Sequence, residues 1–145
     1  MDKLLKEIEQ FERWADEYSD IPQDERGGEW ECDYSNWSAI WSEFERFLSD
    51  NNVLKISDYQ FEKILYIIAR DNENQSIIEM IAENAELLMT IAEKGLTFKS
   101  IDSKWQIVDK LNRLTDMALA KMLLVKYIKQ ENEYVTRMAI KTLVD

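Results

Sequence analysis

The sequence contains no histidine and a single cysteine, Cys32, among its 145 residues. These two shortages exclude disulfide frameworks, zinc sites built from cysteine and histidine, histidine general bases and Ser-His-Asp triads. Any catalysis would therefore depend on carboxylates, and we expect no enzyme activity. A lone thiol suits a reducing compartment, so we expect a cytoplasmic protein.

Glycine and proline are also scarce, with three glycines and one proline, Pro22. Together with 46% hydrophobic residues, this composition excludes collagen, a linker or a disordered chain. It predicts one compact domain over residues 1–145. No apolar run approaches the length that spans a bilayer, and the N-terminus lacks the apolar stretch of a signal peptide. We therefore expect no membrane partner.

Basic residues are outnumbered, since 18 lysines and arginines face 29 acidic residues, a net charge of −11. A negative net charge disfavours binding to a phosphate backbone, so we expect no nucleic-acid binding. We expect a basic protein as the natural partner. The imbalance is local. Residues 1–60 carry 6 basic and 16 acidic residues, whereas residues 61–145 carry 12 and 13. Ten of the sixteen aromatic residues also lie in residues 1–60, which makes this part the most unusual.

Apolar residues recur every three or four positions through most of the chain, which predicts an all-α fold. The first helix is expected over residues 4–18. An aromatic helix is expected over residues 37–48, before the Asn51-Asn52 pair, with its rings in the core.

The start of the third helix is the best marked. Ser57 and Gln60 have the spacing of a capping box, and the helix is expected to end near Arg70. Gly95 is expected as a C-terminal cap of a later helix. The later helices are expected at about residues 75–83, 85–94, 103–111, 117–130 and 133–144.

Residues 21–36 have no helical period and contain Pro22 and the Gly27-Gly28 pair, which predicts a long loop. Long loops in compact domains are often functional. Carboxylates on such a loop would form charge-assisted hydrogen bonds with lysine and arginine, and aromatic rings would accept cation-π contacts. We therefore predict a site for a basic partner made of Asp24, Glu25, Glu29, Trp30, Glu31, Asp33 and Tyr34.

Other interpretations of these residues stay open. Trp30 and Tyr34 could fill the gap between the first two helices while the acidic residues are only solvated. The spacing does not match an EF-hand, so we expect no metal and no cofactor. A pair of carboxylates does not by itself indicate a glycosidase, and the acidic neighbours of Cys32 disfavour a thiolate nucleophile. We interpret Lys121, Lys126 and Lys129 as a solvated face.

The final segment, ENEYVTRMAIKTLVD, resembles the second helix of a HEAT repeat. An acidic turn is followed by Val135 and Arg137, then by Ala139 four residues and Leu143 eight residues after the valine. Thr136 stands where the family usually has arginine. The resemblance implies stacked helices over residues 57–145, following an acidic, aromatic helical hairpin over residues 1–56. The fold expected is therefore all-α, an irregular helical bundle leading into a short HEAT-like α-solenoid.

In its size, acidity, helicity and lack of catalytic residues, the chain also resembles the acidic all-helical immunity proteins of bacterial toxin systems. This resemblance implies an inhibitor that covers the active site of a basic, nuclease-type toxin. The carboxylates of residues 16–33 would then take the place of substrate phosphates. The alternative function is a general HEAT-like scaffold or a peptide-binding module with a groove along the later helices, and the sequence leaves both surfaces open.

Overall fold

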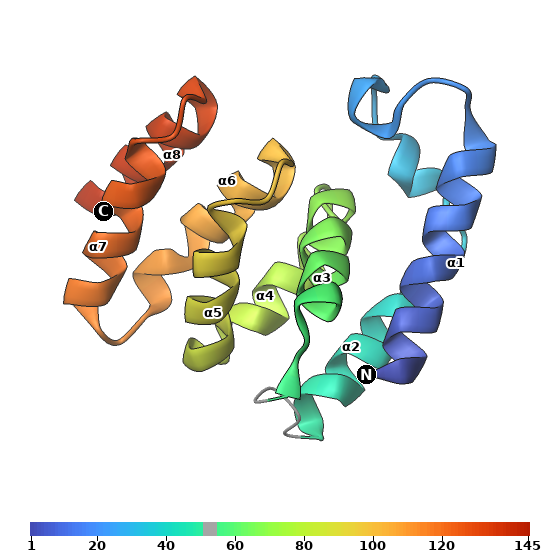
Figure 1. The fold of residues 1–145 in the computed structure, drawn as a ribbon, viewed down its shortest axis with the longest axis horizontal. Helices are drawn as coiled ribbons and strands as arrows, with labels where there is room; N and C mark the ends of the chain where they lie inside the picture. The colour runs from blue at the N-terminus through green and yellow to red at the C-terminus, as the bar shows by residue number, and fades with distance from the viewer. Residues whose placement is uncertain (51–54) are drawn as a thin grey trace. The chain divides into compact units, whose positions relative to one another are not determined.

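The computed structural model describes residues 1–50 and 55–145, and the predicted helix stop at Asn51-Asn52 lies outside these residues. The described residues form eight α-helices with short 3₁₀ turns and no strand (Figure 1). The prediction of an all-α fold is confirmed. The chain forms two compact units, Met1–Lys63 and Ile64–Asp145, and each is described separately.

Unit 1 is built on a pair of helices, α1 (Asp2–Tyr18) and α2 (Trp37–Ser49), which pack against each other (Figure 1). Where the sequence predicts a loop between them, the chain forms two 3₁₀ turns, η1 (Gln23–Glu25) and η2 (Trp30–Asp33). Apolar residues at helical spacing are buried on both helices, as predicted. These buried residues are Leu4, Ile8, Phe11, Ala15, Trp37, Ile40, Phe44 and Phe47.

The third helix, α3 (Asp58–Arg70), begins as the capping box predicts. The Ser57 backbone N–H donates to Gln60 Oε1 at 2.9 Å, and the Gln60 N–H donates to Ser57 Oγ at 3.3 Å. Each side chain thus satisfies a backbone group that the first turn of a helix leaves without a partner.

Unit 2 contains the remaining helices. They are α4 (Ser76–Ala82), α5 (Ala85–Gly95), α6 (Ile101–Lys110), the 3₁₀ turn η4 (Leu111–Arg113), α7 (Met117–Ile128) and α8 (Glu133–Val144). Helix α4 packs with α5 and α6, α5 packs with α6, and α8 packs with both α6 and α7. Short polar side chains begin three of these helices by accepting backbone N–H groups, as N-caps do: Asn84, Asp116 and Asn132.

Gly95 does not take the predicted C-terminal cap position, which Leu96 occupies. Gly95 is the last residue of α5, and its φ is not positive. Its small size is needed because α7 and α6 approach it closely. A Cβ atom on Gly95 would lie 2.6 Å from the Tyr127 hydroxyl and 2.8 Å from Ile107 Cδ1. The prediction of a C-terminal cap was therefore wrong. Glycine is required at position 95 because neighbouring helices pack closely against it, and its backbone conformation does not require glycine.

We expect Gly95→Ala to lower the free energy of unfolding by about 1–3 kcal/mol, the usual cost of overpacking a core. Tyr127 is fully buried, and its hydroxyl donates to the Ala92 carbonyl at 2.7 Å, so Tyr127→Phe should cost about 1 kcal/mol by itself. In the Tyr127→Phe background the glycine substitution should cost less, because the closest clashing atom is gone. Urea unfolding of the four proteins measures this coupling, and an equal cost in both backgrounds would refute it.

A buried cation in unit 2 is neutralised by a small network. Lys110 is 8% exposed, and its Nζ lies 2.7 Å from Glu79 Oε1 and 2.8 Å from Asp109 Oδ2. Arg113 reaches the other Glu79 oxygen at 2.7 Å. The hydrogen bond from Lys110, followed by that from Arg113, lowers the pKa of Glu79 against the opposing effect of its partial burial.

Because the pKa of Glu79 is lower in the folded than in the unfolded protein, the network stabilises the fold above the unfolded pKa. This stabilisation is lost as the pH falls through the folded value. We therefore expect Glu79→Gln to destabilise the protein near neutral pH and to match the parent in strong acid. Denaturant unfolding across this range tests the expectation, and a cost that does not change with pH would contradict it.

Candidate functional site

The candidate site is the acidic connection between α1 and α2, and a cluster of aromatic rings holds it in place. Phe11 of α1 is fully buried at the centre of this cluster. Its ring centroid lies 5.0 Å from Tyr34, 5.0 Å from Trp37, 5.5 Å from Trp14 and 6.2 Å from Trp30. The two helices and the connection therefore share one apolar core, which fixes the backbone of η2.

Trp30 and Tyr34, two of the predicted binding residues, lie inside this cluster. They are 6% and 8% exposed. Trp30 stacks on Trp14 with ring centroids 5.9 Å apart and planes inclined by 19°. The rings of Trp30 and Tyr34 therefore fill the space between α1 and α2, which is the alternative to a binding role that the sequence left open. They present little surface to a partner.

Glu31, also a predicted binding residue, is buried at 4% exposure. Its backbone carbonyl accepts the indole N–H of Trp37 at 2.8 Å, which ties η2 to the first turn of α2. Trp30, Glu31 and Tyr34 are buried because the 3₁₀ turn η2 directs them toward α1 and α2 together. Glu31 therefore belongs to the part of the connection that positions the exposed acidic residues.

Arg26 stabilises the first half of the connection through ring contacts and hydrogen bonds. Its guanidinium lies 4.4 Å from the Trp30 ring centroid and 5.8 Å from that of Tyr18. It donates from Nε to the Ile21 carbonyl at 2.9 Å and from Nη2 to the Ser19 carbonyl at 3.0 Å. This role of Arg26 is not predicted from the sequence. Its one available signal is that Arg26 is the single basic residue among eight acidic ones in residues 16–33.

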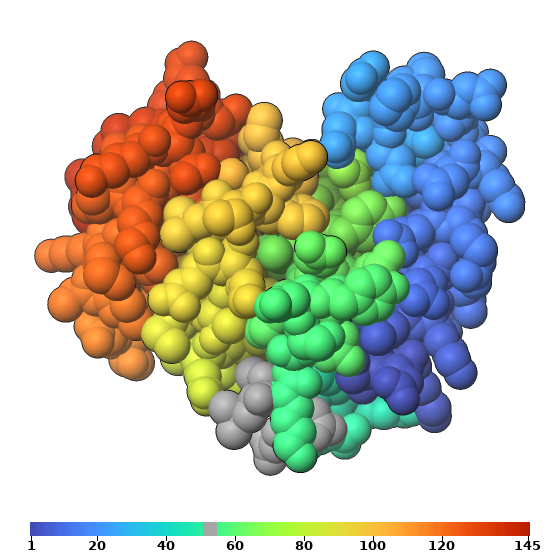
Figure 2. All heavy atoms as spheres, viewed as in Figure 1, coloured from blue at the N-terminus to red at the C-terminus, as the bar shows by residue number. Residues whose placement is uncertain are grey.

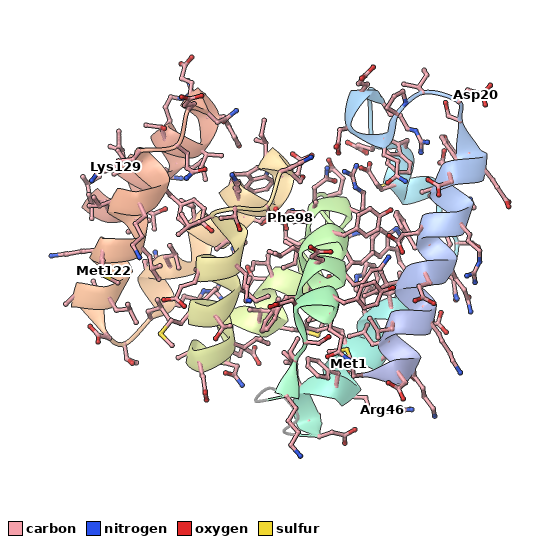
Figure 3. The ribbon with its side chains drawn as sticks, viewed as in Figure 1. Met1, Asp20, Arg46, Phe98, Met122 and Lys129 are labelled. Carbon is pink, nitrogen blue, oxygen red and sulfur yellow. The ribbon has the colours of Figure 1, made fainter. Side chains whose placement is uncertain are left out.

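The four other predicted residues, Asp24, Glu25, Glu29 and Asp33, are exposed, and so is Asp20. Asp20 lies just beyond the end of α1 and is labelled in Figure 3. The predicted site is thus divided into two sets: Asp24, Glu25, Glu29 and Asp33 are exposed, whereas Trp30, Glu31 and Tyr34 are buried.

Two polar contacts brace the exposed side of the connection. The Tyr18 hydroxyl donates to Asp33 Oδ2, and this hydrogen bond, followed by desolvation and the aspartate charge, raises the pKa of Tyr18. The Gln23 side-chain amide donates to Asp16 Oδ1 at 2.9 Å. Both contacts join the connection to α1 without covering Asp20, Asp24, Glu25 or Glu29, which stay exposed.

The chemistry available here is that of exposed carboxylates on a braced support. Such groups form charge-assisted hydrogen bonds with lysine and arginine side chains. Within residues 1–50 and 55–145, no group of three or more acidic or cysteine side chains is arranged to hold a metal ion. The Cys32 thiol is exposed. No helix in the described part of the chain has the length and apolar character needed to cross a bilayer.

Unit 1 also has an open depression of about 390 Å³, but it lies elsewhere. It is formed where α1 begins and α2 ends, and its lining includes Asp2, Glu43 and Arg46. Arg46 is paired there with Glu43 at 3.2 Å. The acidic connection follows the opposite end of α1, so this depression is separate from the candidate site.

Comparison with known proteins yields no relative for this chain: no family model, curated protein or solved structure matches it.

Proposed function

We propose that the chain is an acidic protein inhibitor, an immunity protein that neutralises a basic, nuclease-type toxin by covering its active site. One observation carries the proposal: Asp20, Asp24, Glu25 and Glu29 are exposed together on a connection that Arg26 and the aromatic cluster hold in one conformation. The partner surface would present lysines and arginines that normally bind substrate phosphates.

The bracing matters because flexible loops lose conformational freedom on binding, and that loss reduces affinity. Here Arg26 and the buried rings have already ordered the backbone, so more of the interaction energy would appear as affinity. The charge of residues 1–60 supports the proposal further, since 16 acidic and 6 basic residues attract a cationic partner over a distance. Such steering raises association rates more than it slows dissociation.

In this proposal, α3 to α8 form a short HEAT-like stack that serves as the body of the inhibitor, and the protein acts in the cytoplasm without a cofactor. The inhibitor has no catalytic role and does not contact nucleic acid. It competes with the nucleic acid for the basic active site of the toxin.

The test combines the purified chain with basic nucleases, starting with any that is encoded beside it. We expect loss of nuclease activity at equimolar protein, a one-to-one complex in gel filtration, and an association rate that falls steeply with added salt. Full nuclease activity in the presence of excess protein, for the neighbouring nuclease as for the others, would contradict the proposal.

A further inference from the structure

The outer side of α7 in unit 2 exposes apolar side chains that a soluble helix normally buries. Ten of the twelve residues of α7 are apolar, yet only Ala120, Leu123, Leu124 and Tyr127 are buried. The opposite side exposes Met117, Met122 and Val125 at 54%, 46% and 42%. A helix of this composition is usually covered on more than one side, so this pattern indicates a surface that binds something.

The neighbouring helix also exposes apolar side chains. Helix α8 packs against α7 and exposes Ile140 at 47% and Val144 at 76%. In Figure 2 the atoms of residues 117–145, drawn in orange and red, form the surface at one end of unit 2. Exposed apolar side chains thus occur on both of these packed helices.

The charge of this surface is opposite to that of the protein. Helix α7 contains no acidic residue and carries the exposed Lys121 and Lys126, and the exposed Lys129 follows its last residue. In residues 117–145 five basic residues face three acidic ones, within a chain of net charge −11. Figure 3 labels Met122 of this helix and Lys129, which directly follows it. The lysines therefore lie near the apolar groups and favour a partner with negative charge.

A groove gives the surface its shape. A depression of about 230 Å³ lies between the beginning of α7 and the end of α8. Met117, Ala120, Leu124 and Leu143 provide apolar lining, and the charged residues of the lining are Lys121 on α7 and Asp145 after α8. A concave apolar site with a cation beside it suits an apolar side chain next to a carboxylate.

We propose that this α7–α8 face, made of Met117, Lys121, Met122, Val125, Lys129 and Ile140 with the groove, binds an acidic amphipathic helix of a partner protein. Apolar side chains of that helix, spaced three or four residues apart, would contact the groove and the exposed methionines and valine. Its flanking glutamates and aspartates would pair with the lysines. This surface is distinct from the acidic connection of unit 1, and its partner has the opposite charge.

Two other occupants fit less well. Face-to-face pairing of two copies would bring the lysines of one α7 against those of the other, which is unfavourable without intervening acidic groups. An anionic bilayer would attract the lysines, but it would repel a chain of net charge −11 and would not fill a groove.

The test uses a fluorescein-labelled synthetic peptide that combines leucine at positions i, i+3, i+4 and i+7 with glutamate on the other face. A scrambled peptide and a peptide with lysine in place of glutamate serve as controls. We expect the acidic helical peptide to bind and to gain helicity, and the two controls to bind at least tenfold more weakly. Amide chemical-shift changes should be confined to α7 and α8.

Matched variants locate the site. Val125→Glu and the double variant Lys121→Glu/Lys129→Glu should each weaken peptide binding by roughly tenfold or more. Ile101→Glu changes an apolar side chain of similar exposure, 45%, on α6, and Lys99→Glu changes an exposed lysine before it, so both should bind as the parent does. All five positions are exposed, so the helical circular dichroism signal should be preserved.

Three results would overturn the proposal. They are the absence of peptide binding at the highest soluble concentration, equal binding of the lysine peptide, and equal weakening by the control variants. Binding of phosphatidylserine vesicles without binding of the peptide would identify a lipid surface instead, and concentration-dependent dimers lost in Val125→Glu would identify a second copy. Because the acidic connection is unchanged in these variants, inhibition of a basic nuclease should be unaffected, so the two proposals fail independently.

Discussion

Replacing Asp20, Asp24, Glu25 and Glu29 together by lysine is expected to reduce the affinity for a basic partner by about two to three orders of magnitude. The four reversals change the net charge from −11 to −3 and place positive groups where the partner's own cations would lie. The loss should appear mainly as slower association and a flatter dependence on salt. Surface plasmon resonance at low and high salt measures both.

The fold should survive this change, because all four side chains are exposed and exposed substitutions usually cost little stability. The matched control reverses Glu73, Glu83, Glu93 and Glu131, four exposed glutamates of unit 2, and produces the same net charge. We expect the control variant to lose much less affinity. An equal loss in both variants would show that overall charge, and not the acidic connection, governs binding, and unchanged binding in the first variant would remove the proposed site.

Trp30→Ala is expected to lower the free energy of unfolding by about 3–5 kcal/mol, the usual cost of truncating a large buried aromatic side chain. Trp30 is 6% exposed, stacks on Trp14 and supports the guanidinium of Arg26. Its removal leaves a cavity in the core of unit 1 and releases the connection. Thermal and urea unfolding, followed by circular dichroism, measure the loss, and Trp30→Phe should retain more of the stability because it refills part of the space.

This expectation separates a supporting residue from a binding anchor. An anchor on the surface would speed dissociation of the complex when truncated and would leave the melting temperature of the free protein unchanged. If Trp30→Ala has the melting temperature of the parent and its complex dissociates faster, the binding role predicted for Trp30 would be restored. A marked drop in melting temperature would assign the residue to the core that positions Asp20, Asp24, Glu25 and Glu29.

The sequence by itself determined where the helices lie, because a helix depends on neighbours along the chain. The last helix is predicted at residues 133–144 and observed as Glu133–Val144. The capping box at Ser57 and Gln60 is found as predicted, since a cap joins residues three apart. Helix α6 begins at Ile101, earlier than the predicted residue 103, because Ser100 rather than a later residue takes the cap position.

The tertiary structure alone decided which residues of the candidate site face solvent. Residues 21–36 have no periodic pattern, so nothing in their order distinguishes Glu29, which is exposed, from Glu31, which is 4% exposed. That difference arises from η2 packing on both helices at once. The same holds for Arg26, whose ring contacts and carbonyl partners are brought together only by folding, and for Gly95. The glycine is needed because Tyr127, 32 positions further along the chain, places its hydroxyl where a Cβ atom would lie. Contacts between residues distant in sequence depend on how the helices pack, and a local sequence pattern does not predict them.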